Sequence, residues 1–259
     1  MNNNAITVVC PTYNSFQYIE ETLDALLMQI DPADEIVFSD DGSSDRTVKI
    51  LEEWRTIFED KGVSVVILKN KHQGPGATRN AGIEQARHEW ISFLDADDLW
   101  KPEKILKIKE AITSFPGKNI FLHSEEYVRL DGRKSVMLHG QYYRKDVSLS
   151  QQIYNGSVSF STSAITLHKS VLQQGLFDTT LPNGQDYELW LRLSPFMKLQ
   201  IIPEILGEYI ENPNSITARP YYRRYLSQIR ILARHYKKGG LFITFYMLVR
   251  LTLSRQWLY

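Results

Sequence analysis

Short apolar runs alternate with amphipathic segments over the first hundred residues of this chain. The apolar runs predict buried strands at 5–10, 35–39, 63–68 and 90–94, and the intervening segments predict helices at 16–29, 47–58 and 76–87. Strands that are apolar along their length and separated by helices form parallel sheets with both faces covered. The sequence therefore predicts an α/β fold, with a single Rossmann-like, mostly parallel sheet flanked by helices.

The pattern changes after about residue 115. Short strands are expected at 119–123, 126–130, 160–167, 199–202 and 205–210, with a hairpin turn at Asp131-Gly132 and a helix at 185–193. Cys10 is the only cysteine, so no internal disulfide and no cysteine-built zinc site can form. The six histidines show no metal-pair spacing, which indicates structural or surface roles for them.

Polar side chains follow three of the predicted strands. The three segments read PTYN at 11–14, DDGSSD at 40–45 and DADD at 95–98. Aspartate, glycine and serine also favour turns and helix caps, which explains part of this clustering. Ligands of such sheets bind beyond the carboxyl ends of the strands, however. Carboxylates packed at one sheet edge repel each other, and a cation or a polar ligand relieves that repulsion.

Five segments together resemble the successive signatures of family 2 glycosyltransferases with the GT-A fold. They are VCPTYN at 9–14, SDDGSSD at 39–45, GATRNAG at 76–82, FLDADD at 93–98 and GQDYELWLR at 184–192. The resemblance covers roughly residues 5–215. It implies inverting transfer of a sugar from a nucleotide-diphosphate sugar, by default a UDP-sugar, to a hydroxyl of a glycan or lipid-linked acceptor. It also implies a role in cell-surface polysaccharide or lipopolysaccharide synthesis.

The resemblance also implies which residues bind the donor. The expected donor-binding residues are Pro11, Thr12, Tyr13, Asp40, Asp41, Arg79, Asp95, Ala96 and Asp97. Thr12 and Asp40 match positions that meet the base, while Asp41 either serves there or caps residues 42–44. Arg79 matches the residue that contacts the nucleotide diphosphate; without the motif it would be read as a surface arginine. Gly74, Gly76 and Gly82 are expected at positions of close backbone approach.

The segment Asp95-Ala96-Asp97 matches the Asp-x-Asp motif that holds a divalent ion on the diphosphate. In an extended segment residues i and i+2 point the same way, so both carboxylates can face one ligand. Hard oxygen ligands favour Mg²⁺ or Mn²⁺ over zinc. Asp97 is expected to bind the ion directly, and Asp95 to contact the ribose or a metal-bound water. Asp98 either touches the metal or caps the helix that Pro102 opens.

Asp186 matches the family's catalytic base, which deprotonates the acceptor hydroxyl. The alternative role for this residue is a helix N-cap. The family usually has Glu-Asp at this position, whereas this chain has Gln185-Asp186. The missing neighbouring charge lessens any upward push on the pKa of Asp186. The substitution also leaves the acceptor preference open.

The charge of the chain is divided unevenly. No acidic residue follows Glu211, and the last 48 residues carry nine basic ones: Arg219, Arg223, Arg224, Arg230, Arg234, Lys237, Lys238, Arg250 and Arg255. The preceding 211 residues have a formal charge of −9, from 21 basic and 30 acidic side chains. This division predicts an acidic body with a basic appendage that meets an anionic surface.

The basic appendage is expected to be a C-terminal helical extension. An amphipathic helix at 221–238 is followed by Gly239-Gly240 and an apolar run at 241–249, which is too short to span a bilayer. The extension therefore lies in the headgroup region of an anionic membrane, packs on the catalytic domain, or forms a homo-oligomer. The expected division is a catalytic domain at 1–215, with a donor half at about 1–115 and an acceptor half at about 116–215, and a tail at 216–259.

Two other functions compete with glycosyl transfer. A nucleotidyltransferase would carry a glycine-rich, basic phosphate loop after the first strand, where this chain has Pro-Thr-Tyr-Asn. A nucleic-acid-binding module is disfavoured by the acidic body, so no nucleic-acid partner is expected. The N-terminus lacks the charged start and apolar stretch of a signal peptide. These features predict a cytoplasmic protein, peripheral on the cytoplasmic face of the membrane.

Overall fold

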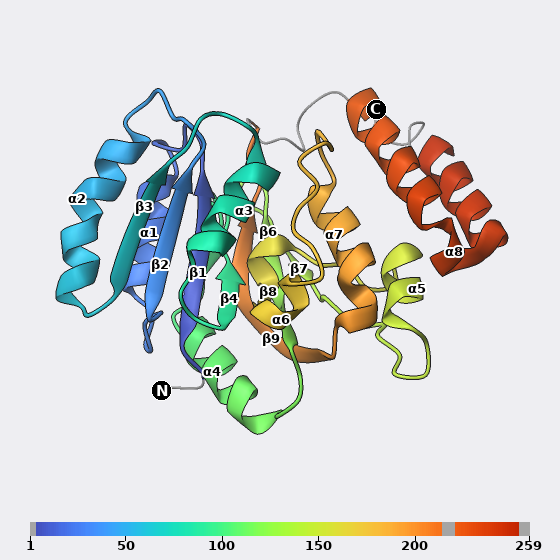
Figure 1. Cartoon of the computed structure of the whole chain (residues 1–259), viewed down its shortest axis with the longest axis horizontal. Coiled ribbons are helices and arrows are strands. Elements are labelled where there is room, and N and C mark those ends of the chain that lie inside the picture. Colours follow the sequence, from blue (N-terminus) through green and yellow to red (C-terminus); the bar gives the residue numbers. More distant parts are fainter. Residues whose placement is uncertain (1–3, 214–220, 254–259) are drawn as a thin grey trace.

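In the computed structural model, which describes residues 4–213 and 221–253, one twisted sheet has helices on both faces (Figure 1). The strands are β1 (Ile6–Thr12), β2 (Glu35–Asp40), β3 (Ser64–Lys69), β4 (Trp90–Phe93), β5 (Leu99–Trp100), β6 (Ile120–Val128), β7 (Lys134–Met137), β8 (Ile165–His168) and β9 (Leu199–Ile210). The α-helices are α1 (Ile19–Leu27), α2 (Thr47–Asp60), α3 (Pro75–Gln85), α4 (Lys104–Ser114), α5 (Leu149–Tyr154), α6 (Lys169–Leu172), α7 (Gln185–Leu193) and α8 (Tyr221–Leu253). Short 3-10 turns lie at Thr162–Ala164 and Ser194–Phe196.

The strand order is β3-β2-β1-β4-β8-β6-β9-β5, with β7 paired to β6. The first four strands are parallel to one another. Strand β8 runs antiparallel between β4 and β6, and β9 returns parallel to β6. The sheet is therefore mostly parallel in direction, and the predicted α/β fold is confirmed.

The second half of the sheet differs from the sequence prediction. The two strands expected on either side of Ser124 form the single strand β6, and those on either side of Pro203 form the single strand β9. The ladder steps from His123–Ile202 to Ser124–Ile205, so Pro203 and Glu204 lie in a bulge. A proline cannot donate to a ladder, and a bulge accommodates it without ending the strand. The strand expected at 160–167 is confined to Ile165–His168.

The core has one part on each face of the sheet. Ile6, Val8 and Cys10 of β1 pack with α1, α2 and α4, whereas Val9 packs on the other face with α3, α5 and α7. Alternate side chains of a strand point to opposite faces, and both faces here are covered. The close approach expected at Gly82 is confirmed, because a Cβ there would lie 2.6 Å from Val9 Cγ1.

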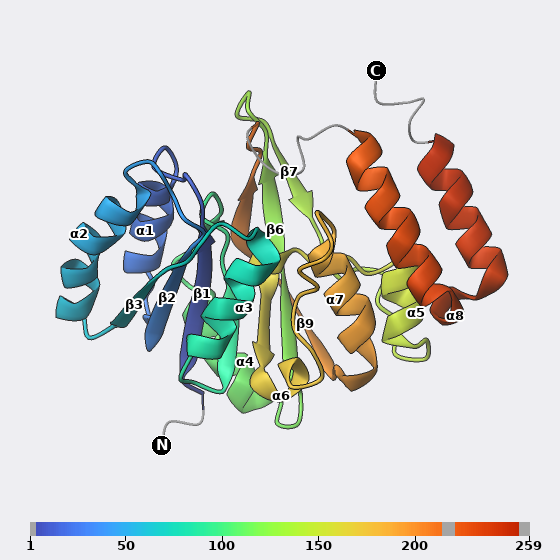
Figure 2. The ribbon, with the colours of Figure 1, turned by 45° about the horizontal axis from the view of Figure 1, so that its top comes forward.

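Helix α8 is bent at Gly240, whose φ of 75° is not helical. Its two arms are residues 221–239 and 241–253. Figure 2 shows them side by side, with the first arm between α7 and the second arm and with the bend near α5. Ile231 and Leu232 of the first arm are part of the core. The Tyr154 hydroxyl donates to the carbonyl oxygen of Leu232 at 3.1 Å and hydrogen-bonds Thr244 Oγ1 at 2.7 Å. The tail therefore packs on the body, as one of the three alternatives predicted.

Three expectations about the tail cannot be compared with the structure. Arg219, Arg255 and the expected domain boundary at 215 lie outside the described residues. Among the helices that are described, none is long and apolar enough to cross a bilayer.

Candidate active site

Asp95 and Asp97 lie in the turn that follows β4. The turn is closed by the Asp98 N–H, which donates to the carbonyl oxygen of Asp95 at 3.1 Å. The prediction that residues 95–97 are extended is therefore wrong. Burial nevertheless alternates along the turn, with Ala96 and Asp98 buried and the two other aspartates partly exposed. Asp95 and Asp97 thus remain the accessible carboxylates of the motif.

Asp98 fixes this turn to the rest of the sheet. Ser163 Oγ donates to Asp98 Oδ2 at 2.6 Å, and the Ile210 N–H donates to Asp98 Oδ1 at 3.1 Å. Burial, followed by the nearby charges of Asp95 and Asp97, raises the pKa of the Asp98 carboxyl well above its usual range. Helix α4 begins only at Lys104, so Asp98 does not cap it, and that alternative is wrong.

Arg79 reaches the first carboxylate of the motif from helix α3. Its guanidinium Nη2 donates to Asp95 Oδ1 at 2.5 Å, and its Cζ lies 5.5 Å from the centre of the Phe177 ring. The Nε of Arg79 is buried and has no hydrogen-bond partner among the residues that the structure describes. A buried donor without a partner costs free energy, and an anionic ligand would relieve that cost. Arg79 is therefore not the surface arginine that its sequence position alone would suggest.

The two accessible carboxylates fit a divalent ion of the Mg²⁺ or Mn²⁺ type. Asn212 Nδ2 donates to Asp97 Oδ2 at 2.6 Å. Burial and then the neighbouring charge of Asp95 raise the pKa of the Asp97 carboxyl. Within residues 4–213 and 221–253, no group of three or more His, Cys, Asp or Glu side chains is placed to hold a metal. Such an ion takes one or two protein carboxylates and completes its shell with substrate phosphates and water.

The predicted base-binding residues lie at the ends of β1 and β2. Asp40 is buried, and its carboxylate accepts from Thr12 Oγ1 at 2.9 Å and from the Ser43 N–H at 2.8 Å. Asp41 accepts instead from the backbone N–H groups of Gln73 at 2.8 Å and Gly74 at 2.9 Å. Asp40 therefore caps the 42–44 turn, and Asp41 holds the loop before α3. Of the two alternatives considered for Asp41, the cap of residues 42–44 is wrong.

His72 is a member of this group that the sequence did not reveal. Its ring stacks on the exposed ring of Tyr13, with centroids 4.4 Å apart and an interplanar angle of 23°. Its Nδ1 lies 2.8 Å from Asp41 Oδ2. Pro11, which precedes Thr12 in β1, is partly buried. The ends of β1 and β2 thus present an aromatic pair next to buried carboxylates.

Asp186 lies in the first turn of α7. Gly184, with a φ of 69°, is the N-cap residue, so Asp186 does not have the N-cap role considered for it. Burial raises the pKa of the Asp186 carboxyl, while the backbone N–H of Tyr187 and the charge of Arg79 oppose the rise. The charge of Asp95 adds to the rise. Asp186 therefore shares its electrostatic environment with the Arg79–Asp95 pair.

Gln185 joins α7 to α3. Its Nε2 donates to the carbonyl oxygen of Leu181, and the side chain is buried. A Cβ at Gly76 would lie 2.7 Å from Gln185 Oε1, so the close approach expected there is confirmed. Gly74 has a different role: a Cβ there would meet no atom of the described residues within 4 Å, but its φ of 92° favours glycine.

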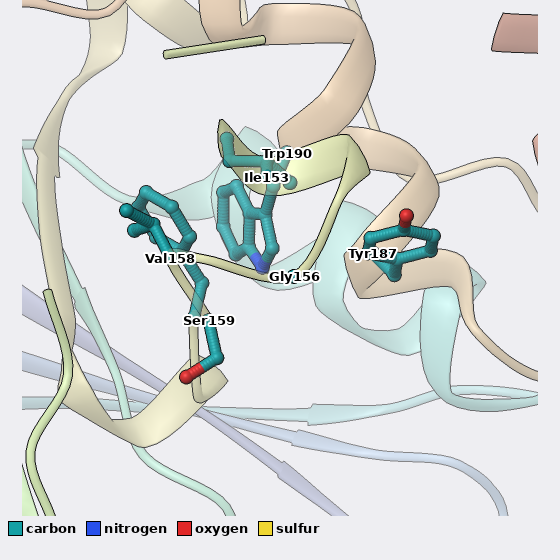
Figure 3. A pocket seen from close by; sticks show the side chains of 7 residues that line it. Ile153, Gly156, Val158, Ser159, Tyr187 and Trp190 are labelled. Carbon is teal, nitrogen blue, oxygen red and sulfur yellow. The ribbon is translucent and has the colours of Figure 1, made fainter. Parts of the chain in front are cut away.

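An apolar cavity of about 160 Å³ lies beside α7 (Figure 3). It is lined by Ile153, Gly156, Val158, Ser159, Phe160, Tyr187 and Trp190. Trp190 is one helical turn beyond Asp186, so the two residues share a face of α7. The sequence did not indicate this cavity, because its lining comes from a loop and two helices that are distant in the chain.

Comparison with known proteins identifies the family. The model named Glycosyl transferase family 2 matches residues 7–175. An uncharacterized glycosyltransferase of Rickettsia conorii is 29% identical over 75% of this chain and 31% of its own length. The amylovoran biosynthesis glycosyltransferase AmsB of Erwinia amylovora is 26% identical over 81% of this chain and 70% of its own length. The chain spans about a third of the length of two curated relatives from Rickettsia.

Two solved structures show the same fold. TarS of S. aureus in complex with UDP-GlcNAc has a TM-score of 0.72 and 21% identity, over 96% of this chain and 73% of TarS. The mannosyltransferase PcManGT of Pyrobaculum calidifontis, in complex with GDP-Man and Mn²⁺, has a TM-score of 0.66 and 19% identity, over 95% and 68%. With the family match over residues 7–175, these findings show that the chain is a glycosyltransferase of family 2 with the GT-A fold.

Proposed function

We propose that this chain is a metal-dependent, inverting glycosyltransferase. It moves a hexosyl or N-acetylhexosaminyl group from a nucleotide-diphosphate sugar, by default a UDP-sugar, to a hydroxyl of a glycan or lipid-linked acceptor. The observation that carries the proposal is the Arg79–Asp95 pair, with Nη2 and Oδ1 2.5 Å apart, in the turn that also leaves Asp97 partly exposed. The named pathway of AmsB and the nucleotide sugars bound by TarS and PcManGT support it. A place in cell-surface polysaccharide or lipopolysaccharide synthesis follows.

In the proposed enzyme, the two halves of the catalytic domain bind different substrates. The donor half, at about 1–115, holds the nucleotide base of the donor between Thr12, Tyr13 and Asp40, with Pro11 and Asp41 fixing the surrounding loops. Arg79 and the turn containing Ala96 bind the diphosphate. The acceptor half, at about 116–215, provides Asp186 and the adjoining cavity. The tail at 216–259 keeps the enzyme at the cytoplasmic face of the membrane, where a lipid-linked acceptor is available.

In the proposed reaction, Asp186 accepts the proton of the acceptor hydroxyl. The acceptor oxygen then forms a bond to the anomeric carbon while the bond from that carbon to the diphosphate oxygen breaks, and the diphosphate leaves with the electron pair. A pKa raised by burial makes the Asp186 carboxylate a stronger base than an exposed aspartate. Arg79 orients the diphosphate through its guanidinium, whose Nε lacks a hydrogen-bond partner within the described part of the chain. An Mg²⁺ or Mn²⁺ ion held by Asp97 and Asp95 would stabilise negative charge on the leaving diphosphate.

Asp186→Asn tests this assignment, because it keeps the shape of the side chain and removes its basicity. We expect transfer to fall by roughly 10²–10⁴-fold, the usual contribution of a general base. Calorimetric titration with UDP and Mn²⁺ should give nearly the wild-type affinity, since donor and metal contacts belong to other residues. Asp60→Asn is a matched control at an exposed aspartate at the end of α2, far along the chain from the motif. Normal turnover in the Asp186 variant would remove this residue from the mechanism.

A further inference from the structure

The second arm of α8 carries a large apolar surface that the fold leaves exposed. Its members, with their exposed fractions, are Leu241 (78%), Phe242 (84%), Phe245 (67%), Tyr246 (55%) and Val249 (37%). They recur at i, i+1, i+4, i+5 and i+8, which is one continuous face of a helix. These five residues are called the exposed stripe below. Large apolar side chains gathered on one helix face mark an interaction surface.

The other side of the same arm already packs on the body. Ile243, Met247 and Leu248 are partly buried against the core, and Thr244 hydrogen-bonds Tyr154. A Cβ at Gly239 would lie 2.4 Å from the Tyr154 ring, so the bend is seated tightly on α5. The arm is therefore apolar on both sides. Packing on the body explains the buried side but not the exposed stripe.

Charge decides between an anionic surface and a second copy of the chain as the partner. The last 48 residues carry nine basic and no acidic side chains. Arg230 and Lys237 of the first arm are exposed, and Arg234 pairs with Asp178 of the body at 2.6 Å. A two-fold symmetric dimer through the stripe would bring two such segments together. An anionic surface offers the complementary charge instead.

We infer that the exposed stripe inserts into the headgroup region of an anionic lipid bilayer. The inference rests on the proposed function, which places the enzyme at a membrane. Phenylalanine and tyrosine side chains suit this region, and basic residues add electrostatic attraction. The first arm stays on the body through Ile231, the Arg234–Asp178 ion pair and the His235–Glu188 contact at 3.2 Å. Membrane binding therefore leaves α7, which carries Asp186, in place.

The test is sedimentation of the full chain with vesicles of phosphatidylcholine, with and without about 30% phosphatidylglycerol. The wild-type chain should sediment with the anionic vesicles, and about 1 M salt should weaken this binding. Phe242→Glu/Phe245→Glu should lower the partition coefficient at least about tenfold, since burial of one phenylalanine is worth more than that factor. Phe115→Glu is the control, because Phe115 is exposed at the end of α4, outside the stripe.

Three results would overturn the inference. The wild-type chain could fail to bind anionic vesicles, or the double variant could bind them as well as the wild type. The wild type could also be a dimer in solution that the double variant converts to a monomer, without vesicle binding; a second copy then covers the stripe. Calorimetry with UDP and Mn²⁺ on the same preparations separates these outcomes from failure of the proposed function, because the stripe is outside the donor site.

Discussion

Gln185→Glu restores the residue that the family usually has, and the structure predicts that the change is costly in this chain. Gln185 Nε2 donates to the carbonyl oxygen of Leu181, and the side chain is buried against Gly76. A carboxylate cannot donate, so one hydrogen bond worth about 1 kcal/mol is lost. The buried Leu181 carbonyl, left facing a carboxylate, adds a further cost of about 1–3 kcal/mol. The free energy of unfolding of the variant should thus be about 2–4 kcal/mol below that of the wild type near pH 8, which lowers Tm by roughly 5–15 °C.

The cost should depend on pH with a definite sign. When the carboxyl introduced by Gln185→Glu is protonated, it can donate to Leu181 as the glutamine does, so folding raises its pKa above the unfolded value. A group with a raised folded-state pKa contributes stability below its unfolded pKa, and that stability is lost as pH rises through the folded pKa. The stability difference from the wild type should therefore shrink as pH falls from about 8 to about 5.

Urea denaturation of the wild type, Gln185→Glu and Gln185→Met at both pH values measures this effect. The methionine variant loses the hydrogen bond without adding a charge, so its deficit should be smaller and nearly independent of pH. A glutamate variant as stable as the wild type near pH 8 would show that the Leu181 contact contributes nothing. A deficit that stays constant with pH would refute the role of the buried charge.

Two further predictions follow from buried polar groups. Arg79→Met should weaken UDP binding in the presence of Mn²⁺ by roughly 10–100-fold, the worth of charge-assisted hydrogen bonds to the diphosphate. Calorimetry measures this with Arg133→Met as the exposed control, and an unchanged Kd would contradict the role of Arg79. Burial lowers the pKa of His123 from 6.5 to about 4, so the unfolded chain binds a proton that the folded chain excludes between these values. The contribution of His123 to the free energy of unfolding should fall by about 3 kcal/mol as pH drops through this window, measured in urea denaturation as the difference between the wild type and His123→Gln.

The first half of the fold was predictable because its pattern is local. Strands such as Ile6–Thr12 are buried on both faces, and only a covered parallel sheet tolerates apolar residues at every position. The second half depends on pairings between distant strands. Nothing in the sequence near Pro203 indicates that a bulge opposite Ser124 will accommodate the proline within a strand. Strand β5 has only two residues and is too short to show periodicity.

The candidate site likewise has residues that the sequence predicts and partners that it does not. The motif aspartates could be found because they follow predicted strands directly. Their partners could not, since Asn212 is 115 residues from Asp97 and Ser163 is 65 residues from Asp98. His72 contacts Tyr13 only because the sheet places the loop after β3 near the end of β1. Sequence patterns give the residue types at an edge of the sheet, and the fold decides which of them meet.

The packing of α8 also has a consequence for how the chain is made. Ile231 and Leu232 complete a core that otherwise comes from β1, β4, β6, β8, β9 and from helices and loops earlier in the chain. Protein domains begin to fold during synthesis, starting from the N-terminal part. Until residues 221–253 leave the ribosome, the surface that these two side chains cover is open to water. The nascent chain therefore exposes an apolar patch to water, and this patch is covered only when the first arm docks.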